Sequence, residues 1–266
     1  MQGGNRLIGQ QKLYTTLTNL IKNNKFPQVM LVEGKIGCGK HTLVQELSVL
    51  LDVEIINITN RVELDTINEI ILEPLKYLYL VDVSQISTRE QNVLLKLLEE
   101  PPVNCYIVLL CTGKNEVLPT VLNRCQYYSF SPYTQEELKQ FTEDESIIEY
   151  VDTPGLIKEL SKYDVQSLVQ LCEKIFLKIQ QASCSNILTI PDKLNFTKDL
   201  QEDKFGYDIF ICVLKNVGLK LYTQNSITYP MYELCEQLYK DSFITNINKK
   251  HLFEHFLISL KVLVGA

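Results

Sequence analysis

The sequence lacks any hydrophobic run long enough to cross a membrane. Its longest stretches without charge, such as Cys105–Gly113, fall well short of the roughly 20 apolar residues that a transmembrane helix needs. The residues Met1–Gln10 contain no hydrophobic segment of the kind found in secretory signals. We therefore expect a cytoplasmic, globular protein with no membrane partner.

Ligands for a metal ion are also scarce. The chain has only three histidines, and no two of its eight cysteines have the C-x2-C or C-x4-C spacing of a zinc site. A free cysteine commonly behaves as a small, buried hydrophobic residue. We therefore expect reduced structural thiols, no zinc and no other metal site.

An excess of positive charge is missing as well. The formal net charge is −6, and residues 131–200 hold 7 Lys and Arg against 12 Asp and Glu, whereas residues 1–130 hold 12 against 13. A chain of this charge is a poor stand-alone ligand for nucleic acid phosphates. Any contact with DNA is therefore expected to be local or to be made through partners.

The chain has the length and patterning of an α/β protein. Its 266 residues are 45% hydrophobic, which suffices for a sizeable core and one to two domains. In the first half, short apolar runs alternate with helix-period segments, which is typical of βα units on a parallel sheet. The predicted strands are Gln28–Glu33, Glu54–Ile58, Tyr77–Asp82, Cys105–Cys111 and Gln126–Phe130. The predicted helices are Gln10–Asn23, Lys40–Leu51, Asp65–Leu72, Thr88–Glu99 and Glu116–Asn123.

One of these helices has readable ends. Ser87 and Glu90 fit a capping box at the start of Thr88–Glu99, because their side chains can satisfy backbone N–H groups that lack a partner in the first turn. Pro101–Pro102 forbids continuation of the helix past Glu100.

The second half of the chain has the pattern of helices. From Ser131 onward apolar residues recur at spacings of three and four. Ser, Cys, Asn, Thr and Pro interrupt this pattern at Ala182–Asp192, where we expect a break. The predicted helical segments are Glu136–Phe141, Leu156–Leu160, Val165–Ile179, Tyr207–Tyr222, Met231–Tyr239 and Leu252–Val262.

A glycine-rich loop follows the first predicted strand and precedes a helix, which is the context of a phosphate-binding P-loop. Gly34, Gly37 and Gly39 allow backbone N–H groups to turn toward a β-phosphate, and Lys40 supplies a positive charge. The alternative interpretation is a tight glycine turn that binds no ligand.

Two positions around this loop, 41 and 83, depart from an ATPase pattern. His41 stands where Ser or Thr would ligate Mg²⁺, an ion that prefers oxygen, and Thr42 lies about 100° further around the helix. Asp82 ends the third strand where an ATPase places a metal-associated carboxylate. Val83 follows it, where a second acid would activate water. We therefore expect weak Mg²⁺ binding and little or no intrinsic ATPase activity, with ATP or ADP as the only candidate cofactor and none required.

Several segments together resemble one family. Ile8-Gly9-Gln10, the P-loop, the run Asn92–Pro102 and Asn123-Arg124-Cys125 are similar to the AAA+ clamp-loader subunits of bacterial DNA polymerase III, over residues 5 to about 160. The resemblance implies a pentameric ring that opens a sliding clamp and places it on primed DNA. It also implies an AAA+ P-loop domain with a five-stranded parallel sheet over residues 1–130, a helical lid over 131–190 and a helical oligomerisation collar over 191–266.

The resemblance assigns roles to individual residues. Arg124 corresponds to the arginine finger that reaches the ATP of a neighbouring subunit, although an ordinary surface arginine is the alternative. Thr112 stands at the sensor-1 position, where a purely structural threonine is the alternative. Gly155 stands where motor subunits carry the sensor-2 arginine. The four-cysteine zinc module of some members is absent, since no cysteine lies between Lys40 and Asp82.

These departures favour a delta-prime-like subunit, which supplies Arg124 to a neighbour without hydrolysing ATP. Its expected partners are gamma/tau-type and delta-type subunits, with the sliding clamp and primer-template DNA contacted through the complex. Two alternatives remain open: an ATP-hydrolysing motor subunit of the gamma/tau type, and a replication adaptor that binds no nucleotide.

Overall fold

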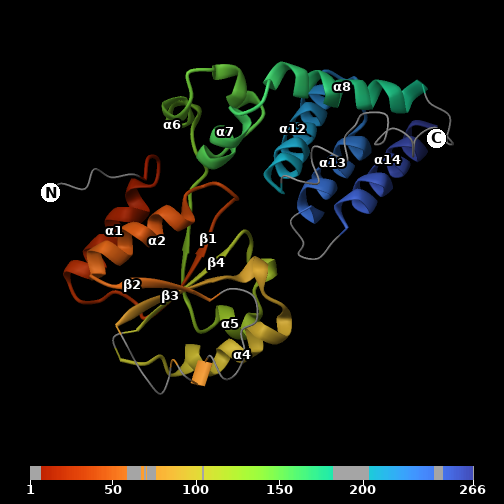
Figure 1. Ribbon diagram of the computed structural model, residues 1–266. Helices are drawn as coiled ribbons and strands as arrows, with labels where there is room; N and C mark the ends of the chain where they lie inside the picture. Colours follow the sequence, from red (N-terminus) through yellow and green to blue (C-terminus); the bar gives the residue numbers. More distant parts are fainter. Residues whose placement is uncertain are drawn as a thin grey trace. The chain divides into compact units, whose positions relative to one another are not determined.

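The computed structural model describes residues 7–58, 67–68, 70, 76–103, 105–181, 204–242 and 248–265 (Figure 1). The chain divides into two compact units. The first, the sheet unit, consists of Met1–Glu137 and Thr153–Gly155. The second, the helical unit, consists of Leu138–Asp152 and Leu156–Ala266. The short segment Thr153–Gly155 therefore belongs to the sheet unit, although the residues on both sides of it do not.

The sheet unit contains one sheet of five parallel strands, as predicted. The strands are β1 (Val29–Glu33), β2 (Glu54–Ile58), β3 (Tyr77–Asp82), β4 (Tyr106–Cys111) and β5 (Gln126–Ser129). Their order is β2-β3-β4-β1-β5, so β1 lies between β4 and β5. Three of the predicted strands differ from the observed ones by a single residue at one end, and the other two match.

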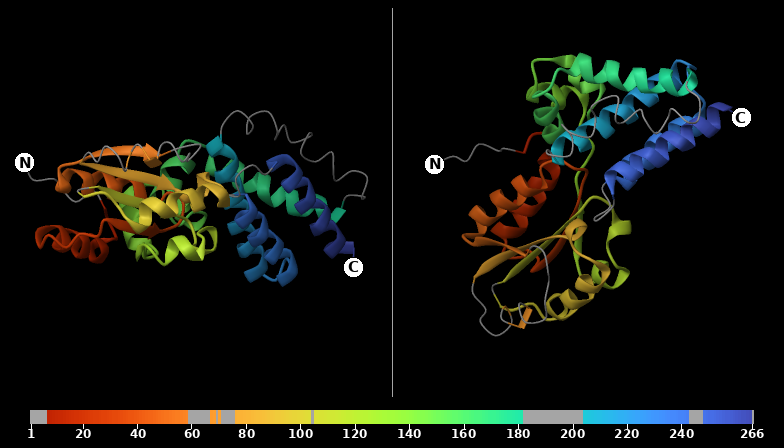
Figure 2. Two further views of the ribbon diagram at one scale, coloured as in Figure 1. Left: turned by 90° about the horizontal axis from the view of Figure 1, so that it is seen from below. Right: turned by 45° about the vertical axis from the view of Figure 1, so that its right-hand side comes forward.

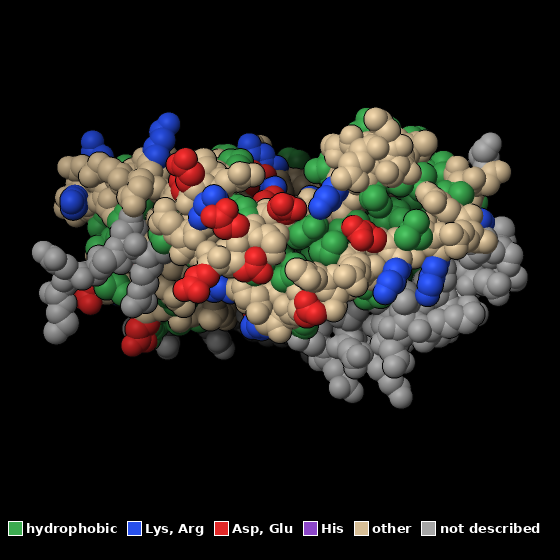
Figure 3. All heavy atoms as spheres, turned by 90° about the horizontal axis from the view of Figure 1, so that it is seen from above, with side chains coloured by type: hydrophobic (Ala, Val, Ile, Leu, Met, Phe, Trp, Pro, Cys, Tyr) green, Lys and Arg blue, Asp and Glu red, His purple; other side chains and the backbone are tan. Residues whose placement is uncertain are grey.

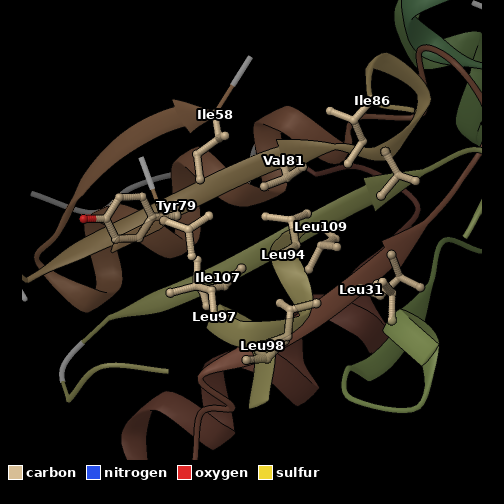
Figure 4. Close-up of a cluster of buried hydrophobic side chains, with 14 of the residues drawn as sticks. Leu31, Ile58, Tyr79, Val81, Ile86, Leu94, Leu97, Leu98, Ile107 and Leu109 are labelled. Carbon is tan, nitrogen blue, oxygen red and sulfur yellow. The ribbon is translucent and has the colours of Figure 1, made fainter. Parts of the chain in front are cut away.

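Helices cover both faces of this sheet. They are α1 (Gln11–Lys22) and α2 (Lys40–Leu51) on one face, and α4 (Thr88–Glu99) and α5 (Pro119–Leu122) on the other. Successive side chains of a strand point to opposite faces. Met30 and Val32 therefore pack toward α1 and α2, whereas Leu31 packs in the cluster that contains Leu94 and Leu97 of α4 (Figure 4).

The ends of α4 agree with the sequence pattern. Ser87 and Glu90 form both hydrogen bonds of the capping box, and the helix ends at Glu99, immediately before Glu100 and the two prolines. Most of the predicted helix Asp65–Leu72 lies outside the described residues.

The predicted helix Glu116–Asn123 was too long at its start. A short 3₁₀ turn covers Lys114–Glu116, and α5 begins only at Pro119. Val117 and Leu118 are extended, with ψ of 129° and 139°. Proline explains the break, because its ring disfavours helical geometry at the preceding residue while suiting the first turn of a helix.

Helices dominate the described residues that follow β5, also as predicted. They are α6 (Gln135–Leu138), α7 (Pro154–Leu160), α8 (Val165–Gln181), α12 (Lys204–Thr223), α13 (Tyr229–Asp241) and α14 (Lys249–Gly265), with 3₁₀ turns at Lys139–Phe141 and Glu145–Glu149. Figure 2 shows α8, α12, α13 and α14 packed together. Phe210 of α12 meets Phe253 of α14 edge to face, with ring centroids 5.8 Å apart. The expected boundary between lid and collar near residue 190 lies outside the described residues, so the three-part division stays a prediction.

The cysteines of the described residues form no disulfides. All seven cysteines within the described ranges have free thiols, and only Cys125 among them is not fully buried; Cys184 lies outside those ranges.

No helix among the described residues is long and apolar enough to cross a membrane. Figure 3 shows acidic and basic side chains interspersed on one face, with hydrophobic side chains between them.

Candidate functional site

The glycine-rich loop connects the carboxyl end of β1 to the first turn of α2. Gly37 and Gly39 have φ of 75° and 101°, a left-handed geometry that favours glycine. Gly34 is required by packing, because a Cβ there would lie 2.6 Å from Cys38 Sγ and 3.0 Å from Phe130 Cβ. The loop and its helix therefore have the backbone arrangement that the sequence predicted.

Lys40, His41 and Thr42 are the predicted contacts for phosphate and metal at the start of α2. Lys40 Nζ donates hydrogen bonds to the carbonyl oxygens of Gly34 and Lys35, the second at 3.1 Å. A phosphate at this loop would therefore compete with backbone carbonyls for the ammonium group. His41 is exposed and Thr42 half-buried in the first turn of α2.

The residues at the end of β3 make local hydrogen bonds and pack in the core. The Asp82 carboxylate accepts hydrogen bonds from Ser84 N at 3.1 Å and from Ser84 Oγ at 2.7 Å. Val83, at the position of a catalytic acid, is 2% exposed and packs in the core cluster with α4. The side chain at position 83 therefore contributes to the hydrophobic core.

Thr112, the sensor-1 candidate, ends β4 and is held by Glu116. Both its backbone N–H and its hydroxyl donate to the Glu116 carboxylate, the N–H at 3.0 Å. Glu33 lies nearby, where it accepts a hydrogen bond from the Tyr127 hydroxyl. Burial, followed by the charges of Glu33 and Glu116, raises the pKa of Cys111 to about 12.

The charges that act on Cys111 at this end of the sheet are of both signs, since Lys40 lies there with Glu33, Asp82 and Glu116. The missing oxygen ligand at position 41 and the two engaged carboxylates at Asp82 and Glu116 do not fit a Mg²⁺-triphosphate. Within the described ranges, no three His, Cys, Asp or Glu side chains form a group that could hold a metal ion.

Backbone carbonyl oxygens of the P-loop accept hydrogen bonds from residues that lie far along the chain. Thr153 Oγ1 donates to the oxygen of Ile36 at 2.8 Å, and the Tyr133 hydroxyl donates to the oxygen of Cys38 at 2.7 Å. Between them, Gly155 N donates to the oxygen of Gly37 at 2.8 Å. Three consecutive loop carbonyls therefore have partners within the sheet unit. The sequence did not predict these contacts; its one signal was Gly155, at a position where the resemblance implies an arginine in motor subunits.

Arg124 lies near the amino ends of β1 and β5, at the edge of the sheet opposite to the P-loop, which follows the carboxyl end of β1. Met30 pairs with Gln126 and Glu33 with Ser129, so the start of β5 is level with the start of β1. The five residues of β1, at about 3.3 Å each, separate that edge from the P-loop by about 16 Å. The Arg124 side chain cannot span this distance, so it does not reach the P-loop of its own chain.

Arg124 is held at two of its nitrogen atoms. Nη2 pairs with the Glu99 carboxylate, and Nη1 donates to the oxygen of Thr120 at 2.7 Å. The side chain remains 33% exposed. Glu99 is a second residue whose contact the sequence analysis did not identify, although it lies in the run Asn92–Pro102.

A segment of the chain is similar to a known protein family. Residues 52–134 match the family described as DNA polymerase III, delta subunit. The match covers about a third of the chain, so the similarity to this family is established for that segment.

Proteins similar to this chain are named as gamma and tau subunits. It is 26% identical over 181 residues to DNA polymerase III subunit gamma of Buchnera aphidicola subsp. Acyrthosiphon pisum, covering 55% of this chain and 50% of that protein. It is 26% identical over 166 residues to subunit tau of Bacillus subtilis, covering 50% of this chain and 30% of that protein. The chain thus spans half or less of the length of these relatives. A gamma subunit-related protein of Thermotoga maritima has 15% identity and a TM-score of 0.49, over 93% of this chain and 98% of that one.

Proposed function

We propose that this chain is a delta-prime-like subunit of the DNA polymerase III clamp loader, which supplies Arg124 to the ATP site of a neighbouring subunit. The observation that carries the proposal is the position of Arg124, which is exposed and lies at the sheet edge opposite its own P-loop. In this role the chain completes a site on another chain and needs no nucleotide of its own.

The chemistry suits a guanidinium group. It stays charged, and its planar set of N–H donors matches the oxygens of a phosphoryl group. A finger supplied by another chain stabilises charge in the transition state only when the two subunits are assembled. Hydrolysis by the neighbour would therefore depend on the ring, in which we expect gamma/tau-type and delta-type partners acting on a sliding clamp and primer-template DNA.

The P-loop of the chain supports a role without hydrolysis. His41 offers no oxygen to Mg²⁺, Val83 is buried, and Gly155 places backbone rather than arginine against Gly37. The isolated chain is expected to hydrolyse ATP negligibly, and a turnover near roughly 1 s⁻¹, the low end for ordinary enzymes, would contradict this.

The test is a reconstituted clamp loader that carries Arg124→Ala. Removal of an arginine finger slows hydrolysis by about 10³-fold or more at the site it serves, so the burst of ATP hydrolysis on clamp loading is expected to lose the share of that site. Arg89→Ala, an exposed arginine in the first turn of α4, is the matched control. A burst unchanged by Arg124→Ala would overturn the proposal.

A motor subunit of the gamma/tau type is the second candidate, favoured by the names of the relatives above. Titration of a labelled ATP analogue with and without Mg²⁺ separates the two, because a motor binds tightly and in a metal-dependent way. A replication adaptor that binds no nucleotide is the third candidate. It predicts no stoichiometric ring when the chain is mixed with clamp-loader subunits.

A further inference from the structure

We infer that Glu99 is a positioning residue, which holds the Arg124 guanidinium in the orientation from which it acts on the neighbouring ATP. The inference rests on the proposed function. It begins from two contacts on one guanidinium: Glu99 accepts from Nη2, and the backbone oxygen of Thr120 accepts from Nη1 at 2.7 Å. Together they restrain the plane of the group from one side.

The two holding groups come from separate elements that are themselves anchored. Glu99 is the last residue of α4, a helix that starts in a capping box and buries Leu94, Leu97 and Leu98 in the core. Thr120 lies in α5, whose approach is fixed by α4, because the buried side chain of Gln91 bonds backbone groups just before it. A displacement of Glu99 or Thr120 would therefore require movement of packed structure.

The arrangement leaves part of the guanidinium available. Arginine has five N–H donors, and the contacts of Arg124 use one on each terminal nitrogen. The remaining donors and the 33% exposure of the side chain allow contact with phosphate oxygens of another chain. A side chain already held in place loses less conformational freedom when it docks, and catalysis is sensitive to such positioning.

The same geometry separates positioning from a structural role. The Glu99 side chain is 50% exposed, and an exposed ion pair contributes little to folding stability. Loss of Glu99 should therefore leave folding and ring assembly nearly intact while it slows hydrolysis.

The experiment uses the reconstituted clamp loader with Glu99→Ala, Glu99→Gln and Glu100→Ala. Glu99→Ala is expected to lower kcat of the clamp-loading ATPase about 10-fold, with KM for ATP unchanged, because misplacement of a catalytic group is costly. Glu99→Gln keeps an oxygen acceptor in place and should retain most of the activity. Glu100→Ala removes the adjacent exposed carboxylate and should have no effect.

Two further comparisons make failure informative. The double variant Glu99→Ala/Arg124→Ala should be no slower than Arg124→Ala, because Glu99 acts through that arginine. Wild-type activity for Arg124→Ala would overturn the proposed function itself. A slow Arg124→Ala beside a fully active Glu99→Ala would overturn only the positioning role.

If Glu99→Ala does not fold, Glu99→Asp replaces it in the comparison. That change keeps the charge but withdraws the carboxylate by one methylene, so it should be slower than Glu99→Gln. The reverse order would overturn the inference, since charge rather than a fixed hydrogen bond would then matter.

Discussion

Gly155 lies directly against Gly37, and its backbone N–H donates to the Gly37 carbonyl oxygen at 2.8 Å. A Cβ at position 155 would lie 2.5 Å from Gly37 Cα and 2.9 Å from its oxygen. Because these neighbours are backbone atoms, they cannot move aside as a flexible side chain would. With the P-loop in this conformation, position 155 admits glycine and excludes a larger side chain such as arginine.

Gly155→Ala tests this contact directly. The added methyl group overpacks the P-loop, and overpacking typically costs about 1–3 kcal/mol in the free energy of unfolding. Equilibrium urea unfolding measures the change. Gly265→Ala is the control, because a Cβ there meets nothing within 4 Å; equal stability of the two variants would mean that the P-loop shifts freely.

Gln91 is expected to stabilise the segment Glu116–Leu118, which leads into α5 and on to Arg124. Its side chain is 4% exposed, donates to the oxygen of Glu116 at 2.9 Å and accepts from Leu118 N at 2.9 Å. Gln91→Leu leaves both backbone groups without a partner, which costs about 1–3 kcal/mol. Thermal or urea unfolding measures this loss, and the neighbouring Asn92→Ala, at an exposed position of α4, should change stability far less.

Alkaline pH is expected to destabilise the chain. Burial is the first cause that raises the pKa of Tyr127, Tyr133 and Tyr232 to about 12, and it raises the pKa of the Cys111 and Cys125 thiols to about 12 as well. The unfolded chain loses the tyrosine protons from about pH 10, whereas the folded chain keeps them to about pH 12. The contribution of these tyrosines to stability is therefore complete below about pH 10 and is lost as the pH rises to about 12.

The pH effect is measured as the urea midpoint against pH, with phenolate absorbance recorded on the folded protein. Tyr133→Phe removes one titrating group and should flatten the fall of the midpoint. A urea midpoint that falls as steeply with pH in Tyr133→Phe as in the wild type would contradict the expectation.

Local patterns in the sequence predicted most of the regular structure. The period of the apolar residues identified all five strands within one residue at each end, and Lys40–Leu51 and Thr88–Glu99 matched the observed helices. These strand and helix predictions are correct because hydrophobic periodicity and capping act over a few neighbouring residues. The helix at Glu116–Asn123 was wrong at its start, because the extended residues before Pro119 are also held from α4 by Gln91.

The sequence by itself determined the parallel α/β fold, the glycines that shape the P-loop and the identities of His41, Val83 and Arg124. Only the tertiary structure decided what these groups touch. Thr153 reaches the loop across 117 positions of the chain and Glu99 meets Arg124 across 25, separations at which no local pattern specifies a partner. The strand register likewise placed Arg124 and the P-loop at opposite edges of the sheet. The physical reason is that backbone propensity acts over a few residues, whereas side-chain pairing depends on which elements the folded core brings together.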